Sequence, residues 1–210
     1  MRSYGMVVDL LFKTSMRFIY GILLKKLYNK LVSLHTRERI YSYTSNDIKM
    51  IIRHFKSLGF KKIHTEEFHD MICDRESFKP STLEKLALKL GEKHASLYRG
   101  LELERGIEIS VDEARKILRE YTHYGVILAS IAARYITLPW IHVIGGVFTR
   151  KEYRGRGYAK AVALALTREA VASGALAGLH VEEDNEPAIR VYKSLGYRIT
   201  KTRIWIFAYP

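Results

Sequence analysis

The sequence predicts an α/β fold with a mixed β-sheet, preceded by a helical region. After residue 124, apolar β-branched segments and helical patterns follow one another in the order strand, strand, helix, strand, helix, strand. Before residue 100, the segments with a clear pattern are helical. We therefore expect a basic helical region of unassigned role at residues 1–99 and an α/β domain at residues 100–210.

Helical patterns cover much of the first 121 residues. The expected helical segments are residues 5–34, 44–60, 81–91 and 110–121. The second of these ends at Gly59, a residue type common after helix ends. Capping boxes open the last two, because Ser81 is followed by Glu84 and Ser110 by Glu113. The segment 60–80 has no clear pattern.

Strand patterns dominate the second half of the chain. Strands are expected at residues 125–136, 140–149, 176–183 and 197–209, and helices at 157–173 and 187–196. Pro139 separates the first two strands. Gly145 and Gly146 lie inside the second strand and indicate a bulge or the close approach of a ligand. The last segment is either one long strand or a hairpin.

Cysteine content and hydropathy narrow the class of protein. Cys73 is the single cysteine, so the chain forms no internal disulfide, and we expect a cytoplasmic protein. No apolar run approaches the ~20 residues that span a bilayer. His64, His69 and Cys73 lack the spacing of a zinc site, so we expect no metal.

The net charge of +13 is unevenly distributed. Residues 1–65 hold 13 Lys and Arg against 3 acidic residues, an excess of 13 − 3 = +10. Such a surface attracts nucleic acid, acidic membranes or anionic cofactors. No aromatic-interleaved nucleic-acid motif accompanies the charge, so nucleic-acid binding stays an alternative that we do not favour.

A glycine-rich basic turn, RGRGYAKA at residues 154–161, precedes the longest expected helix of the second half. Unpaired amides and the helix dipole at a helix start favour an anion, most naturally a phosphate. Gly155 and Gly157 let the backbone approach closely, and Arg154, Arg156 and Lys160 add positive charge. The turn lacks the third glycine of a dinucleotide fingerprint and is not a G-x-x-x-x-G-K-[ST] loop.

This turn resembles the acyl-CoA pyrophosphate loop, Q/R-x-x-G-x-G/A, of the GNAT superfamily of N-acetyltransferases. The match runs from Arg154 to Ala159. A second segment, NEPAIRVYKSLGY at residues 185–197, resembles the family's next motif at the expected distance. The resemblance covers roughly residues 100–210. It implies a mostly antiparallel sheet flanked by helices, with acetyl-CoA as co-substrate.

The resemblance also implies a cofactor site. Val147, Phe148 and Thr149 would line the pantetheine arm, and Asn185 would contact the cofactor. The pyrophosphate would lie on the turn formed by Arg154, Gly155, Arg156, Gly157, Tyr158, Ala159 and Lys160. One departure is Lys151, which stands where many members have proline. We expect it to change the stiffness of the turn and not its chemistry.

Transfer to an amine needs a neutral nucleophile, a stabilised oxyanion and a protonated leaving thiolate. By the resemblance, Tyr192 is the general acid, and amides near Gly145 and Gly146 serve the oxyanion. His180 is the expected general base. Alternatives for the base are His142, Glu182 and Glu183, whereas Cys73 lies outside the matched region.

The expected function is direct transfer of an acetyl group from acetyl-CoA to a primary amine of unknown identity, carried by a small molecule or a protein. Two alternatives stay open. One is a nucleic-acid-binding or regulatory module built on the same fold. The other is an acyltransferase for a longer acyl-CoA, or for amino-acid acceptors. A homodimer is also left open, and the first 35 residues are expected to lie outside the catalytic unit.

Overall fold

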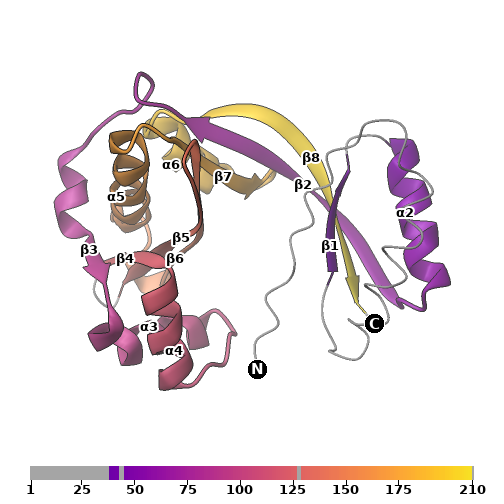
Figure 1. Ribbon diagram of the computed structural model, residues 1–210, viewed down its shortest axis with the longest axis horizontal. Helices are drawn as coiled ribbons and strands as arrows, with labels where there is room; N and C mark the ends of the chain where they lie inside the picture. Colours follow the sequence, from indigo (N-terminus) through magenta and orange to yellow (C-terminus); the bar gives the residue numbers. More distant parts are fainter. Residues whose placement is uncertain (1–37, 43–44, 127–128, 210) are drawn as a thin grey trace. The chain divides into compact units, whose positions relative to one another are not determined.

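The computed structural model describes residues 38–42, 45–126 and 129–209 (Figure 1). The helix expected at residues 5–34 lies outside these ranges. The chain divides into two compact units. One comprises the chain up to Phe68 together with Thr202–Pro210, and the other comprises His69–Lys201. The strands β2 (Lys62–Cys73) and β8 (Arg198–Tyr209) contribute to both units.

The first unit combines β-strands with one described helix. β1 (Glu38–Ser42) pairs antiparallel with β8, from Glu38 opposite Ala208 to Ser42 opposite Ile204. The helix α2 (Ser45–Ser57) lies beside these strands (Figure 1). Its apolar residues Ile48, Ile51 and Phe55 pack with the strand residues Ile206 and Ala208. The expected helix at 44–60 is thus confirmed, because its apolar face finds a sheet to cover.

The second unit contains the sheet that carries the candidate site. From β2 the strand order continues with β7 (Leu176–Glu182), β6 (Ile141–Thr149), β5 (Ser130–Leu138), β4 (Thr122–Val126) and β3 (Leu88–Leu90). The pairs from β3 to β6 are antiparallel, whereas β6 and β7 are parallel. The expected mixed and mostly antiparallel sheet is confirmed. The last segment is one long strand, β8, and not a hairpin.

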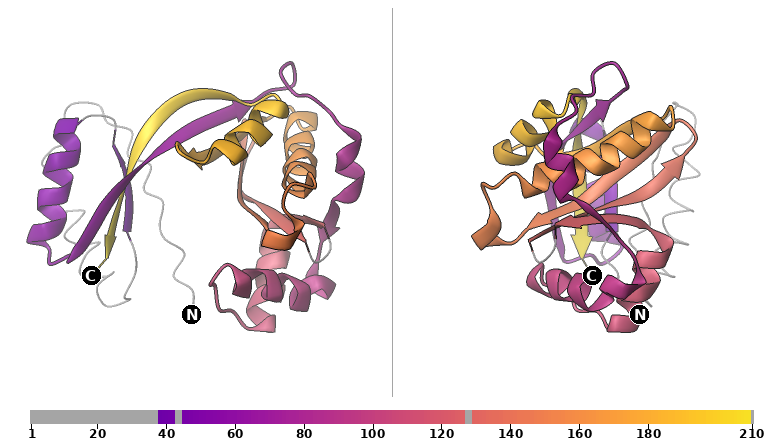
Figure 2. Two further views of the ribbon diagram at one scale, coloured as in Figure 1. Left: turned by 180° about the vertical axis from the view of Figure 1, so that it is seen from behind. Right: turned by 90° about the vertical axis from the view of Figure 1, so that its left-hand side faces the viewer.

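Helices cover both faces of this sheet (Figure 2). α5 (Tyr158–Ala172) and α6 (Glu186–Ser194) pack on one face, in a core that includes Ile144, Leu164 and Leu179. α3 (Ala95–Glu104) and α4 (Val111–Glu120) pack on the other face, against Ile131 and Phe148. Neighbouring strand residues point to opposite faces, so each strand supplies side chains to both layers.

The region before residue 100 differs from the expected helical region. The unpatterned segment 60–80 contains most of β2, and the helix expected at 81–91 is wrong. There the chain forms a short 3₁₀ helix, η1 (Thr82–Leu86), and then β3. Glu84 forms an ion pair with Arg168 of α5 and does not complete a capping box. Pairing of β3 with β4 outweighs local helix propensity here.

Other local signals act as expected. Ser110 and Glu113 form the expected capping box of α4, with bonds of 3.1 and 2.8 Å between each side chain and the other residue's backbone N–H. The single strand expected at residues 125–136 is wrong, because this segment contains the end of β4 and most of β5. The two compact units divide the chain differently from the expected boundary at residue 99, which falls inside α3. No helix in the described ranges is long and apolar enough to cross a membrane.

Candidate active site

The strands β6 and β7 separate partway along their length. Their parallel pairing runs from Ile141 opposite Leu176 to Ile144 opposite Leu179 and stops there. β6 nevertheless continues to Thr149 and β7 to Glu182. Along residues 145–149, the β7-facing edge of β6 therefore has backbone groups outside the ladder. An extended chain carrying amide groups, such as a pantetheine arm, fits this edge.

A bulge lies at the point of separation. Ala133 of β5 pairs with Gly145, but Ile131 pairs with Phe148, so β6 holds one extra residue. Gly146 has φ +61°, a left-handed conformation that glycine adopts without strain. At Gly145, a Cβ atom would lie 2.5 Å from Cε1 of Tyr135. The bulge expected from the paired glycines is confirmed, and it turns backbone groups of β6 out of the regular ladder.

The three expected pantetheine-lining residues all lie beyond the separation. Val147 packs against the core below α5, and Phe148 packs on the α3 and α4 side. The hydroxyl of Thr149 is 2.9 Å from Oγ of Ser130 on β5. The guanidinium of Arg105, at the end of α3, lies 5.9 Å from the ring centre of Phe148. The segment is thus held from both faces, and its contact with a cofactor stays a prediction.

The glycine-rich turn wraps the start of α5. Gly155 and Gly157 have φ of +77° and +80°, and Gly157 is the N-terminal cap of the helix. The first turn carries no acidic residue, so its unpaired amides and dipole favour an anion. Nε of Arg154 donates to the carbonyl of Thr149 at 3.2 Å. The turn thereby joins the end of β6 and fits a pyrophosphate.

The remaining residues of the turn extend this basic surface. The guanidinium of Arg156 lies 5.5 Å from the ring centre of Tyr153, and Tyr158 lies beside the same ring at 6.4 Å. Ala159 and Lys160 belong to the first turn of α5. Lys151, at the position where the resembling family has proline, is exposed and begins a single 3₁₀ turn, η3 (Lys151–Tyr153). The turn therefore forms without the proline.

Asn185 caps α6. Its Oδ1 accepts a hydrogen bond from the backbone N–H of Ala188 at 3.2 Å. Its own backbone N–H donates to the carbonyl of Glu182 at 3.0 Å, so it also fixes the link from β7 to α6. This capping role is sufficient to explain an asparagine here. A contact between Asn185 and the cofactor remains a prediction.

Tyr192 lies on the side of α6 that faces the sheet and is 7% exposed. Its ring packs edge-on against Tyr197, with 5.9 Å between ring centres. The hydroxyl makes no hydrogen bond to any residue of the described ranges, and burial raises its pKa to about 12. A phenol in this state keeps its proton at neutral pH and is able to donate it. Its role as the general acid stays a prediction.

His180 lies near the end of β7, on the face opposite to the core residues Leu179 and Val181. Its Nδ1 is 2.8 Å from Oδ1 of Asp70 on β2. Tyr192 of α6 and His180 of β7 thus lie on different faces of the sheet. Asp70 was not predicted, because nothing in the unpatterned segment 60–80 indicated that β2 neighbours β7. The one hint in the sequence was that an acidic residue, Asp70, stands close to the apolar residues Met71 and Cys73.

The other candidates for the base are placed differently. His142 is buried on the α5 face of β6, 3.4 Å from the Arg134 guanidinium. Burial, together with the Arg134 charge, lowers its pKa. The same guanidinium contacts Glu169 of α5 at 3.2 Å, so His142 belongs to a polar cluster that joins the sheet to α5. Glu182 and Glu183 are exposed at the end of β7.

Cys73 is buried, which raises the pKa of its thiol and disfavours the thiolate.

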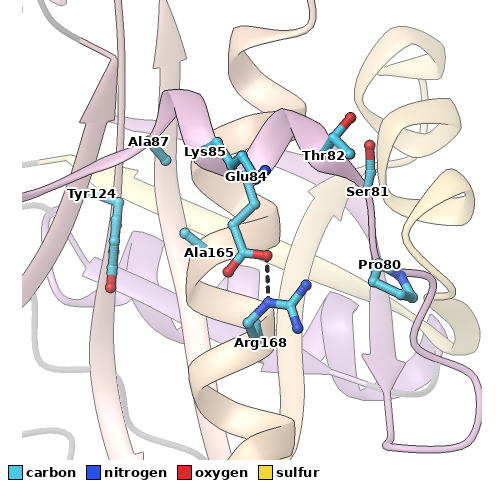
Figure 3. Close-up of a pocket in the computed structure, with 9 residues that line it drawn as sticks. All are labelled: Pro80, Ser81, Thr82, Glu84, Lys85, Ala87, Tyr124, Ala165 and Arg168. Carbon is cyan, nitrogen blue, oxygen red and sulfur yellow. Dashed lines mark hydrogen bonds and ion pairs between the residues drawn. The ribbon is translucent and has the colours of Figure 1, made fainter.

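A separate open pocket lies between η1, β4 and α5 (Figure 3). Glu84 and Arg168, which form an ion pair, line it together with Tyr124 and Ala165. None of the expected site residues lines this pocket. Within the described ranges, no group of three His, Cys, Asp or Glu side chains is placed to hold a metal ion.

Comparison with known proteins agrees with this geometry. Residues 124–206 match the family model described as FR47-like protein. A putative GNAT-family acetyltransferase from Novosphingobium aromaticivorans is 25% identical, with a TM-score of 0.63 over 86% of this chain and 79% of that one. A GCN5-related N-acetyltransferase-like protein from Streptococcus suis is 18% identical, with a TM-score of 0.60 over 81% and 71%.

A GCN5-related N-acetyltransferase from Kribbella flavida is 12% identical, with a TM-score of 0.62 over 91% of this chain and 75% of that one. A search of curated proteins finds no significant match. The family model over residues 124–206, the fold and the separated strands support membership of the GNAT superfamily. This family and fold indicate an acyltransferase that uses an acyl-CoA.

Proposed function

We propose that this protein transfers an acetyl group from acetyl-CoA directly to a primary amine. The observation that carries the proposal is the separation of β6 from β7 after Ile144 and Leu179, next to the left-handed glycines of the turn. The exposed β6 edge suits the amides of the pantetheine arm. The start of α5 suits the pyrophosphate.

The residues divide the chemistry among them. The thioester supplies an activated acetyl carbonyl. Backbone amides at the Gly146 bulge face developing negative charge on that carbonyl oxygen. The Tyr192 hydroxyl gives a proton to the departing thiolate, and His180 takes a proton from the acceptor's ammonium group. Two proton carriers on opposite faces of β7 keep the two transfers apart.

The test is a mass-shift assay with acetyl-CoA and a panel of primary amines, with acetyl-CoA binding measured separately by calorimetry. We expect binding, together with a gain of one acetyl group on at least one amine. Propionyl-CoA and butyryl-CoA in the same assay report the acyl length. Absence of both binding and transfer would contradict the proposal. Binding and transfer confined to longer acyl groups would replace acetyl by a longer acyl substrate.

A further inference from the structure

A histidine and a carboxylate from distant parts of the sequence meet in the second unit. Nδ1 of His180 on β7 lies 2.8 Å from Oδ1 of Asp70 on β2. The side chain of Asp70 is 12% exposed and that of His180 is 28% exposed. The contact is thus mostly shielded from water, which strengthens it relative to a surface pair.

The chemistry of the contact fixes the histidine tautomer. An ionised carboxylate has no hydrogen to donate and only accepts hydrogen bonds. Nδ1 of His180 must therefore carry the hydrogen in this contact. In the neutral ring, the lone pair then lies on Nε2. A base needs such a lone pair, and the bond to Asp70 determines which nitrogen has it.

The backbone on either side of the contact is held in place. Oγ1 of Thr200 on β8 donates to the carbonyl of Asp70 at 3.1 Å. Met71, the next residue, is fully buried in the core below α6, as is Cys73. His180 is flanked by Leu179 and Val181 in the same core. These neighbours hold the backbone of both residues in place, which helps to keep the two side chains in register.

We propose that Asp70 is a positioning residue for His180. This inference rests on the proposed function, because it takes His180 as the base. Nε2 accepts one proton from the acceptor's ammonium group, and the ring, now an imidazolium, later returns it to water. The freed amine attacks the acetyl carbonyl. As the C–N bond forms and the C–S bond breaks, the nitrogen releases a second proton to water. Tyr192 protonates the departing thiolate and then regains a proton from water.

Asp70 acts twice in this sequence. It selects the Nδ1–H tautomer before the proton transfer, and its negative charge stabilises the imidazolium afterwards. Asparagine at position 70 keeps the size of the side chain but removes the charge, and its amide is able to donate to Nδ1 and select the other tautomer. Glutamate keeps the charge on a longer side chain. The two substitutions thus separate charge from shape.

The first measurement is the ¹⁵N NMR spectrum of histidine-labelled parent protein, with His180→Gln to assign the signal. In spectra recorded where the ring is neutral, we expect the Nδ1–H tautomer. This readout needs no turnover, so it tests the contact independently of the activity. A neutral Nε2–H tautomer overturns the inference.

The second measurement is steady-state kinetics on an amine that the parent acetylates. Asp70→Asn should lower kcat about 10–100-fold, the usual cost of losing a partner that orients a histidine. KM for acetyl-CoA should stay within twofold, and Asp70→Glu should regain part of kcat. In a His180→Gln background, Asp70→Asn should cause almost no further loss, because residues that act as a unit are not additive.

The matched control is Asp74→Asn. Asp74 follows β2 and pairs with Arg198 at 2.7 Å, so it is another carboxylate–cation contact in the same unit that lies outside the site. Its kcat should equal that of the parent. Equal losses from Asp70→Asn with and without His180 overturn the inference alone. A parent that acetylates no amine contradicts the proposed function and, with it, the inference.

Discussion

At the scale of single residues, the environment of Tyr192 determines what its hydroxyl does. Tyr192→Phe keeps the ring that packs on Tyr197 and removes only the buried hydroxyl. We expect kcat to fall about 10²–10⁴-fold, the usual contribution of a general acid. Acetyl-CoA affinity by calorimetry should change little. A variant with the parent's kcat would exclude Tyr192 as the acid.

The pKa of Tyr192 also predicts a pH dependence. An acid is lost as pH rises through its pKa, and burial raises that of Tyr192 to about 12. The parent should therefore show no alkaline loss of kcat up to about pH 10, well below that value. A pH–rate profile between pH 6 and 10 checks this. A decline between pH 8 and 10 in a protein that stays folded would point to another acid.

The effect of His180→Gln on the rate should also depend on pH. Its rate should fall most near neutral pH and recover partly at high pH, because a free alkylammonium has a pKa of ~10.4 and then loses its proton without help. The same amine and buffers serve for parent and variant. If the rate of the variant equals that of the parent at every pH, the base is His142, a glutamate or bulk water.

At the scale of elements, the turn before α5 allows a direct test of anion binding. Gly157→Glu places a negative charge at the helix start and a Cβ 3.3 Å from Cδ1 of Leu83. Acetyl-CoA binding should be lost in calorimetry. The control is Gly174→Ala, since Gly174 has φ +82° with open space around it and lies beyond the other end of α5. An affinity of Gly157→Glu within twofold of the parent would refute the assignment of the turn.

The end of α6 predicts a difference in stability. At Gly196, with φ +99°, a Cβ atom would collide with the backbone carbonyl oxygen of Ser77, whereas at Gly174 it would meet open space. Gly174→Ala should cost about 1–2 kcal/mol, the price of a left-handed residue with a Cβ. Gly196→Ala should cost at least about 3 kcal/mol because backbone must also shift. Urea unfolding of both variants checks this, and equal costs would contradict it.

The elements also explain what the sequence could predict. α5, α6 and the bulge of β6 carry local signals, because glycines and a capping asparagine mark their ends. β2 and β3 carry none, since a strand is stabilised by its neighbours and these lie far away in sequence. Asp70 was missed for that reason. The roles of Tyr192, His180 and Asn185 come from the family resemblance and stay predictions.

At the scale of the whole molecule, all the expected site residues fall within one compact unit, His69–Lys201. The excess positive charge is concentrated elsewhere in the sequence, at residues 1–65. Excess positive charge strengthens association with polyanions, whereas the proposed turn offers its phosphate ligand mainly backbone amides. The acyltransferase hypothesis and the nucleic-acid alternative therefore predict different dependences of ligand binding on salt.

Filter binding to duplex DNA and to RNA at 50 and 200 mM salt makes this comparison. We expect any nucleic-acid affinity to fall steeply, by about 10³-fold or more if six or more phosphates are contacted. Acetyl-CoA affinity should fall far less, because acetyl-CoA has few phosphates and, in the proposed site, the turn offers them mainly backbone amides. Gly157→Glu should lose acetyl-CoA and keep any nucleic-acid binding. Tight nucleic-acid binding at 200 mM salt, in a protein that transfers no acyl group, would favour a regulatory module on this fold.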